Sequence, residues 1–191
     1  ATLKDDGARV GFRWSQLSDT QRAYLGSSSI LDFLRGDRRN EASTRGKPLR
    51  QRATVLGDIV HSRAYLVHDK ADPTIFVGAN DGMLHAFNAS CTSAVRSPGC
   101  DVNGGKERWA YVPSMLLPRM KHLSVDPYVH DYYVDGQINV KTIAAGSKRI
   151  LVGGLGAGGK GLFALDITGS AGLTASTEAE VAQKIMWEIT P

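Results

Sequence analysis

Short stretches of the chain alternate apolar and polar residues, which is the pattern of half-buried β-strands. After the glycine at 161, the side chains of Phe163, Leu165 and Ile167 fall on one face of such a strand. Two further apolar runs, IFVGAN and MLHAFNA, flank Asp81-Gly82, and this dipeptide is a strong hairpin signal because glycine tolerates positive φ. The pattern therefore predicts β-hairpins joined by tight turns.

The run GGLGAGGKGLFALDIT, positions 153–168, overlaps two phosphate-binding motifs. Gly154, Gly156 and Gly159 fit G-x-G-x-x-G, and Lys160 stands where a P-loop has its lysine. A P-loop continues with serine or threonine and then a helix, but Gly161 occupies that position and a strand pattern follows. We interpret these glycines as the turn of an enlarged hairpin.

The sequence pattern repeats after about 75 residues, and such a repeat indicates an architecture built from similar units. Segment 75–89 aligns with 150–167, and the offset grows from 75 to 78 residues, with all three added residues in the turn. A lysine and a tryptophan follow each copy. The aligned residues are Val77 with Val152, Gly78 with Gly153, Ala86 with Ala164, Phe87 with Leu165, Asn88 with Asp166, Lys106 with Lys184, and Trp109 with Trp187.

Each copy predicts about four short strands: one upstream strand (in HSRAYLV or INVKTIA), two hairpin strands and one tryptophan-bearing strand. A single sheet of this kind cannot cover both of its faces, so neighbouring copies should pack face to face around an axis, as in a β-propeller. The predicted fold is all-β, with about two blades of an incomplete propeller over residues 53–191. A β-sandwich is the alternative. Uncovered faces at either end would favour dimerisation.

Residues 1–52 predict two short helices and a basic linker. Ser18 and Gln21 have capping-box spacing, Ser28 or Ser29 can cap the helix ILDFLR, and glycines at 26 and 36 suit the two helix ends. The first strand is expected near TVLGDIV. The linker carries much of the basic character, opposed only by acidic residues at 37 and 41, and its basic residues are Arg35, Arg38, Arg39, Arg45, Lys47, Arg50 and Arg52.

Charge and composition restrict the partners. The net charge is +4, but no aromatic residue lies within the basic run to stack a base, so we predict a solvated linker and no nucleic-acid partner. No apolar run approaches the ~18 residues of a membrane span, which predicts that the chain does not cross a bilayer. The opening ATLKDDGARV has neither an initiator methionine nor a leader, as expected of an excised or processed segment.

The two cysteines, Cys91 and Cys100, flank the turn-rich stretch TSAVRSPG. Such a stretch lets their Cα atoms approach to disulfide distance, and two thiols without nearby histidines do not make a zinc site. We predict a disulfide-closed loop and therefore an oxidising compartment. Two free, buried cysteines are the alternative.

Several motifs resemble the PilC/PilY family of type IV pilus proteins, in its C-terminal propeller domain. They occur in the order that the family shows, and cover most of the chain: ILDFLRGDRRNE, RATVLGDIVHS, PTIFVGANDGMLHAFNA, GKERWAYVPS, YYVDG and GLGAGGKGLFALDIT. The resemblance implies quinoprotein-like blades within a large secreted protein at the pilus tip. It also implies support of pilus biogenesis and twitching motility, adhesion to host or abiotic surfaces, and minor pilins as partners. The expected location is extracellular, reached through the periplasm and outer membrane.

Metal and cofactor sites are not expected in this segment. Family members carry a calcium loop of alternating aspartates, but no D-x-[DN]-x-[DN]-G run occurs here, so Ca²⁺ is expected only elsewhere in the parent protein. The five histidines lack metal-ligand spacing, and His85 is expected to be a polar position on a strand.

Arg35-Gly36-Asp37 spells an integrin-type tripeptide, which makes it a weak candidate for adhesion. Gly36 is also where the second helix should end, and that placement predicts ordinary helix-end charges at the two flanking positions.

The sequence favours a structural, non-enzymatic protein. No G-x-S-x-G elbow or recognisable catalytic order of serine, histidine and aspartate occurs. Two alternatives stay open: a propeller fragment of a quinoprotein dehydrogenase, and a periplasmic scaffold for assembly of outer-membrane proteins. The connector at 113–127 is expected to contain a short helix packed on a blade.

Overall fold

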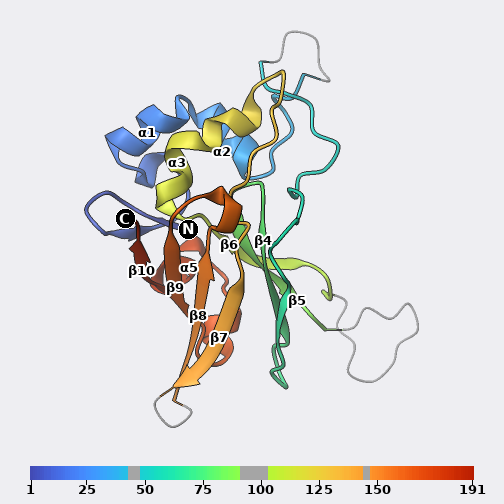
Figure 1. The fold of residues 1–191 in the computed structure, drawn as a ribbon, viewed down its shortest axis with the longest axis vertical. Coiled ribbons are helices and arrows are strands. Elements are labelled where there is room, and N and C mark those ends of the chain that lie inside the picture. Colours follow the sequence, from blue (N-terminus) through green and yellow to red (C-terminus); the bar gives the residue numbers. More distant parts are fainter. Residues whose placement is uncertain (43–47, 91–102, 144–146) are drawn as a thin grey trace.

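The computed structural model describes residues 1–42, 48–90, 103–143 and 147–191. Two four-stranded sheets lie next to each other, and a layer of short helices crosses one end of them (Figure 1). Within the described residues, no helix is both long enough and apolar enough to cross a membrane.

The first sheet is antiparallel and has the order β3-β4-β5-β6. Its strands are β3 (Tyr65–Val67), β4 (Thr74–Ala79), β5 (Met83–Asn88) and β6 (Glu107–Tyr111). Gly82 takes a φ of 93° in the turn between β4 and β5, a conformation that glycine adopts without strain. The predicted Asp81-Gly82 hairpin is confirmed.

The second sheet repeats this arrangement. Its strands are β7 (Ile138–Ile143), β8 (Lys148–Gly154), β9 (Leu162–Asp166) and β10 (Ile185–Ile189), antiparallel and in the order β10-β9-β8-β7. The glycine run forms the turn between β8 and β9, with one 3-10 turn, η4 (Gly156–Gly158). A Cβ on Gly158 would lie 1.8 Å from the carbonyl oxygen of Tyr133, so this glycine permits a close backbone approach. The strand that begins at Leu162 confirms the hairpin interpretation.

The register of the two sheets corrects the predicted alignment by one residue in the first hairpin strand. Gly78 pairs with Leu84, and Gly154 pairs with Leu162, so these glycines are equivalent and lie 76 positions apart. The turn is longer by two residues, 155–161 against 79–83, and not by three. Gly153 therefore takes the position of Val77, and a Cβ there would lie 2.3 Å from the Phe163 ring. Cross-strand pairing fixes register, whereas a shared Val-Gly dipeptide does not.

The N-terminal part contains a two-stranded ribbon and the two predicted helices. The ribbon pairs β1 (Thr2–Leu3) with β2 (Arg9–Val10), and a 3-10 turn, η1 (Trp14–Gln16), follows it. Helix α1 (Asp19–Leu25) has the expected capping box and ends at Gly26, with φ 86°. Helix α2 (Ser28–Leu34) is capped by Ser27, one residue earlier than expected.

The segment 53–64 contains no strand, so the strand expected near TVLGDIV is wrong. Its backbone instead binds the β4–β5 turn: the Gly57 N–H donates to the Asp81 carboxylate (2.8 Å), and the Asp58 carbonyl accepts from the Asn80 N–H (3.0 Å). These contacts hold the segment against the end of the first sheet, and the segment does not join the sheet as a strand.

Helices also fill the connections. The connector between the sheets contains η2 (Ser114–Leu116), α3 (Leu117–Met120) and η3 (Lys121–Ser124), as expected for a short helix there. An unexpected insert, α4 (Gly169–Leu173) and α5 (Glu178–Gln183), separates β9 from β10. Helix α1 packs on α3 and α2 on η3, so the helical layer uses residues from both sides of the predicted division at residue 52. That division stays a prediction.

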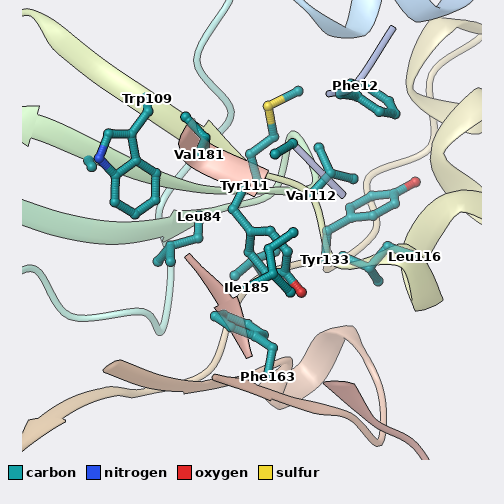
Figure 2. Packing of buried hydrophobic residues seen from close by; sticks show 14 of the residues in the cluster. Phe12, Leu84, Trp109, Tyr111, Val112, Leu116, Tyr133, Phe163, Val181 and Ile185 are labelled. Carbon is teal, nitrogen blue, oxygen red and sulfur yellow. The ribbon is translucent and has the colours of Figure 1, made fainter. Parts of the chain in front are cut away.

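The core lies between the sheets and under the helices (Figure 2). Tyr111 of the first sheet meets Phe163 of the second, with ring centroids 5.2 Å apart. Trp109 packs on Phe76 at 5.6 Å and is covered by the insert that carries Val181. The two sheets therefore bury one face of the first against one face of the second, as adjoining blades do.

Candidate functional site

The candidate adhesion tripeptide forms the corner at which α2 ends. Gly36 has a φ of 101°, and its N–H donates to the Phe33 carbonyl at 2.9 Å. The Asp37 N–H donates to the Asp32 carbonyl at 2.9 Å. These bonds satisfy the last carbonyls of the helix, so the glycine ends α2 as the sequence predicts.

The Arg35 side chain extends from this corner into the protein. Its Nη1 donates to the Phe12 carbonyl at 2.9 Å, and its Nη2 lies 2.7 Å from Glu178 Oε1. Arg13 contacts the same carboxylate oxygen at 2.7 Å. Burial alone would raise the pKa of Glu178, but the hydrogen bond and charge of Arg35, with the charge of Arg13, lower it. Arg35 thus ties the helical layer to the insert of the second sheet.

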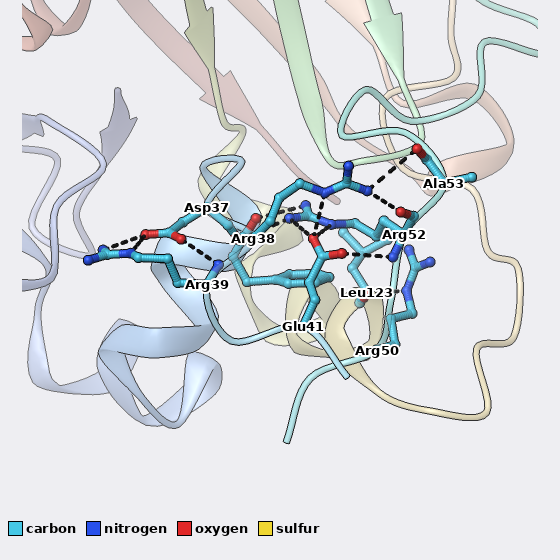
Figure 3. Close-up of polar contacts among 9 residues, drawn as sticks. Asp37, Arg38, Arg39, Glu41, Arg50, Arg52, Ala53 and Leu123 are labelled. Atoms are coloured by element: carbon cyan, nitrogen blue, oxygen red, sulfur yellow. Dashed lines mark hydrogen bonds and ion pairs between the residues drawn. The ribbon is translucent and has the colours of Figure 1, made fainter. Parts of the chain in front are cut away.

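The Asp37 side chain has a different partner, which Figure 3 shows. Its Oδ2 accepts from Arg39 Nε at 2.7 Å, and its Oδ1 accepts from the Arg39 N–H at 2.8 Å. The Arg39 hydrogen bonds lower the pKa of this half-buried carboxyl. Arg35 and Asp37 are therefore both engaged within the chain, one inward and one along the surface.

A buried ion pair lies beneath the corner (Figure 3). Arg52 is 7% exposed and Glu41 2% exposed, and Arg52 Nε and Nη2 lie 2.9 and 2.8 Å from Glu41 Oε1. The Arg52 guanidinium also stacks on Phe33, 3.6 Å from the ring centroid, and donates to the carbonyls of Phe33 and Asp37. The pair joins the end of α2 to the chain that enters the propeller sheets.

The balance of forces at Glu41 explains why it stays charged. Burial would raise its pKa, but the Arg52 N–H and guanidinium, with a smaller contribution from Arg38, outweigh burial and lower the pKa below its ordinary value. Arg38 Nε lies 3.3 Å from the same carboxylate. The sequence offered one signal for this buried ion pair, because Glu41 is the one glutamate within the basic run.

The interpretation of the basic run as a solvated linker is wrong at two positions. Arg52 is buried, and Arg50 is half-buried, with its Nε donating to the Leu123 carbonyl at 2.6 Å. Arg38 is exposed, and it bonds to the carbonyls of Arg52 and Ala53. The Arg50 guanidinium also lies 4.0 Å from the Tyr128 ring centroid. These arginines fasten the segment to α2 and η3, because their partners come from distant parts of the chain.

His85 occupies a polar position on β5, as expected. It lies at the centre of a second network of internal hydrogen bonds. Its Nδ1 lies 2.5 Å from Glu107 Oε1, and its Nε2 lies 3.1 Å from both oxygens of Asp81. Burial would lower the pKa of His85, but the hydrogen bonds and charges of Asp81, then of Glu107, raise it to about 9. The imidazolium therefore donates from both nitrogens at neutral pH, and neither nitrogen is available as a ligand or base.

A cavity of about 620 Å³ lies between the N-terminal segment, β6 and α5. Arg35, Glu178 and Trp109 help to line it, and the first two of these are bound to each other. Across the described residues, no three histidine, cysteine, aspartate or glutamate side chains are placed to hold a metal ion. Cys91 and Cys100 lie outside the described residues, so their disulfide stays a prediction.

Two like four-stranded sheets, packed face to face in chain order and each ending in a tryptophan-bearing strand, define a protein of the β-propeller class. The PilY1 beta-propeller domain family matches residues 50–190. This chain belongs to that family, and the β-propeller fold, not the β-sandwich, is confirmed.

The relatives identified by sequence agree with this assignment. The chain is 36% identical over 187 residues to a type IV pilus biogenesis factor PilY1 homolog of Xylella fastidiosa, covering 80% of this chain and 14% of the relative. It is 31% identical over 220 residues to the type IV pilus biogenesis factor PilY1 of Pseudomonas aeruginosa, covering 93% and 17%. The crystal structure of the P. aeruginosa PilY1 C-terminal domain matches with 34% identity and a TM-score of 0.37, over 62% of this chain and 18% of that one. The chain thus spans about a sixth of its relatives.

Proposed function

We propose that this chain is a non-enzymatic structural and adhesive part of a type IV pilus tip-associated protein, which supports pilus biogenesis, surface adhesion and twitching motility. The observation that carries the proposal is the family match over residues 50–190, since it covers both sheets and the connector. The relatives identified by sequence are named as type IV pilus biogenesis factors.

The architecture supports a mechanical role. Arg35 joins α2 to the insert, and Arg52 joins α2 to the chain that enters the first sheet. Arg50 joins that entering chain to η3. Charge-assisted hydrogen bonds of this kind are about twice as strong as neutral ones. The helical layer and the sheets can therefore transmit force as one unit during extension and retraction of a fibre.

In this proposal the Arg35-Gly36-Asp37 tripeptide is a structural corner. Arg35 and Asp37 are both engaged by internal partners, so a receptor would have to break these bonds before it could bind them. Adhesion to a host or abiotic surface then uses other parts of the propeller or of the parent protein.

The proposed partners are minor pilins, and the proposed location is the pilus tip at the cell surface. The protein would pass through the periplasm, which suits the predicted disulfide between Cys91 and Cys100. Calcium, as a cofactor of the parent protein, is assigned to residues outside this chain.

The test uses a strain that lacks the full-length gene, complemented with the wild-type gene or with one lacking residues 53–191. We expect surface pili and twitching only with the wild-type gene, and co-purification of minor pilins only with the wild-type protein. Quinone-dependent turnover by the full-length protein, or binding of outer-membrane barrel peptides in place of pilins, would overturn the proposal in favour of a dehydrogenase or an assembly scaffold.

The tripeptide is tested separately with Asp37→Glu, which keeps a carboxylate for Arg39 but lengthens the side chain. We expect unchanged pili and unchanged attachment to integrin-coated surfaces. Loss of attachment with normal piliation would show that the tripeptide is an adhesion site.

A further inference from the structure

A second cavity, of about 230 Å³, lies between the end of α2, η3 and the segment that enters the first sheet. Leu34 of α2 and Leu123 of η3 line it, and Val55 and Leu56 line it from the entering segment. The first two side chains are buried, whereas Val55 and Leu56 are 41% and 39% exposed. The cavity therefore has apolar walls, one of which reaches solvent.

Arg50 lines the same cavity and is fixed in two ways. Its Nε donates to the Leu123 carbonyl at 2.6 Å (Figure 3), and its guanidinium lies 4.0 Å from the ring centroid of Tyr128, another lining residue. A guanidinium that is already stacked and bonded through Nε loses little further freedom when its remaining nitrogens bind a ligand. Arg50 is thus held ready for an anion.

The two terminal nitrogens of Arg50 are open. In the part of the chain that the structure describes, neither Nη1 nor Nη2 has a hydrogen-bond or ion-pair partner, and neither is sealed from solvent. Arg52 lines the same cavity but is fully engaged, because its guanidinium bonds to Glu41 and to the carbonyls of Phe33 and Asp37. Of these two arginines, Arg50 is the one that offers an unused pair of donors.

The acidic residues of the cavity are engaged elsewhere. Asp58 Oδ2 lies 2.8 Å from His130 Nε2, and Asp81 Oδ2 lies 3.1 Å from His85 Nε2. Neither carboxylate forms an ion pair with Arg50 in the described part of the chain. The positive charge of Arg50 therefore has no internal counter-ion in this cavity.

We infer that this cavity binds a small carboxylate that carries one apolar group. Both Nη groups of Arg50 donate to the two carboxylate oxygens, which is the bidentate geometry that a guanidinium favours. The apolar group lies against Leu34 and Leu56. A volume of about 230 Å³ is below the roughly 300–1,000 Å³ of common small-molecule sites, so it admits a group of about the size of one amino-acid residue.

Two sources share this ligand chemistry: the C-terminal residue of a polypeptide and a free short-chain monocarboxylate. Either would present a carboxylate to Arg50 and an apolar chain to the walls. This site goes beyond the proposed function, since binding of such a carboxylate does not depend on a role in pili.

Ligand-observed NMR titration of the full-length parent protein tests the site with three probes. N-acetyl-leucine mimics a polypeptide C-terminus, hexanoate is a free monocarboxylate, and N-acetyl-leucinamide lacks the carboxylate. We expect saturable binding of the first two probes and none of the amide. Tighter binding of N-acetyl-leucine than of hexanoate would assign the site to polypeptide C-termini, and the reverse order would assign it to free monocarboxylates.

Variants connect the binding to the cavity. Arg50→Gln keeps a donor for the Leu123 carbonyl but removes the pair of Nη groups, and it should weaken the binding of N-acetyl-leucine at least about tenfold. Arg63→Gln is the matched control, because Arg63 is an exposed arginine close by in the sequence, and its affinity should equal that of the wild type. Leu56→Ala removes part of an apolar wall and should weaken binding about fivefold.

Three results would overturn the inference: equal binding of the acid and the amide, no saturable binding of N-acetyl-leucine at millimolar concentration, or wild-type affinity in a folded Arg50→Gln protein. The Tm of each variant shows whether it is folded. If Arg50→Gln does not fold, the comparison of acid with amide and the Leu56→Ala variant decide, and wild-type affinity in Leu56→Ala would place the binding outside this cavity.

Discussion

The covered face of the first sheet and the outer face of the second carry equivalent rows of apolar side chains in opposite surroundings. Leu84, Trp109 and Tyr111 are almost completely buried, whereas Leu162, Trp187 and Ile189 are 36–55% exposed. Strand order, register and the bulge before the tryptophan are the same. The difference teaches that a blade is built by its own sequence, but that its neighbour decides whether its apolar row contributes to stability.

The largest effect should come from removal of the tryptophans. Trp109→Ala is expected to lower the free energy of unfolding by about 3–5 kcal/mol, because it leaves a cavity and an unpaired Leu173 carbonyl. Trp187→Ala should lower the free energy of unfolding by about 1 kcal/mol or less in the same chain, since Trp187 is 36% exposed. Urea unfolding of both variants measures the difference. Equal losses would show that the outer face is not free in this chain.

The leucines give a second matched pair. Leu84→Ala is expected to cost about 3 kcal/mol, because Leu84 is 0% exposed, and Leu162→Ala less than about 1 kcal/mol. Both residues pair with a glycine, so the backbone contexts match. The comparison is contradicted if Leu162→Ala lowers the free energy of unfolding as much as Leu84→Ala does.

The two sheets also differ at one internal position, where His85 in the first corresponds to Phe163 in the second, and this predicts a pH dependence. The pKa of His85 is about 9 in the folded protein, above the ordinary value of 6.5 in the unfolded chain. The contribution of His85 to the free energy of unfolding is therefore complete below pH 6.5 and is lost as the pH rises through 9. It amounts to at most about 3 kcal/mol. Unfolding measured between pH 6 and 10 should show this loss in the wild type and not in His85→Gln. Parallel curves for the two proteins would refute the network.

The smallest effect concerns the polar contact across the covered face. Glu188 Oε1 accepts from the Tyr111 hydroxyl at 2.5 Å, and Oε2 accepts from the Ser114 N–H at 3.0 Å. Glu188→Gln places an amide NH₂ against one of these donors. It should lower the free energy of unfolding by about 1–2 kcal/mol. A double-mutant cycle with Tyr111→Phe measures the coupling. Additive losses would mean that the two residues contribute independently.

The elements that sequence reasoning predicted correctly depend on local chemistry. The Asp81-Gly82 turn, the strand from Leu162, the tryptophan strands and the capping box at Ser18 all follow from positive φ, alternation or side-chain capping. The end of α2 at Gly36 was predicted for the same reason. These signals lie within a few residues of the feature that they specify.

The wrong predictions involve partners that are distant in the chain. The register makes Gly154, not Gly153, the equivalent of Gly78. The backbone of segment 53–64 forms its hydrogen bonds with the β4–β5 turn. The insert α4–α5 was missed, although Thr177 and Glu180 form a capping box that local reasoning could have found. The burial of Arg52 was missed although Glu41 stands in the same basic run, because Phe33 and Glu41 reach Arg52 only after α2 folds back.

The sequence by itself determined the repeated strands, their turns and the end of α2, because the conformational preferences of glycine, aspartate and alternating apolar residues act over a few bonds. Only the tertiary structure decided that Arg35 points inward to Glu178, that Arg52 is buried, and that Trp109 is covered while Trp187 is exposed. Burial and ion pairing depend on which surfaces meet in space, and equivalent residues in two copies of one repeat can therefore have different surroundings.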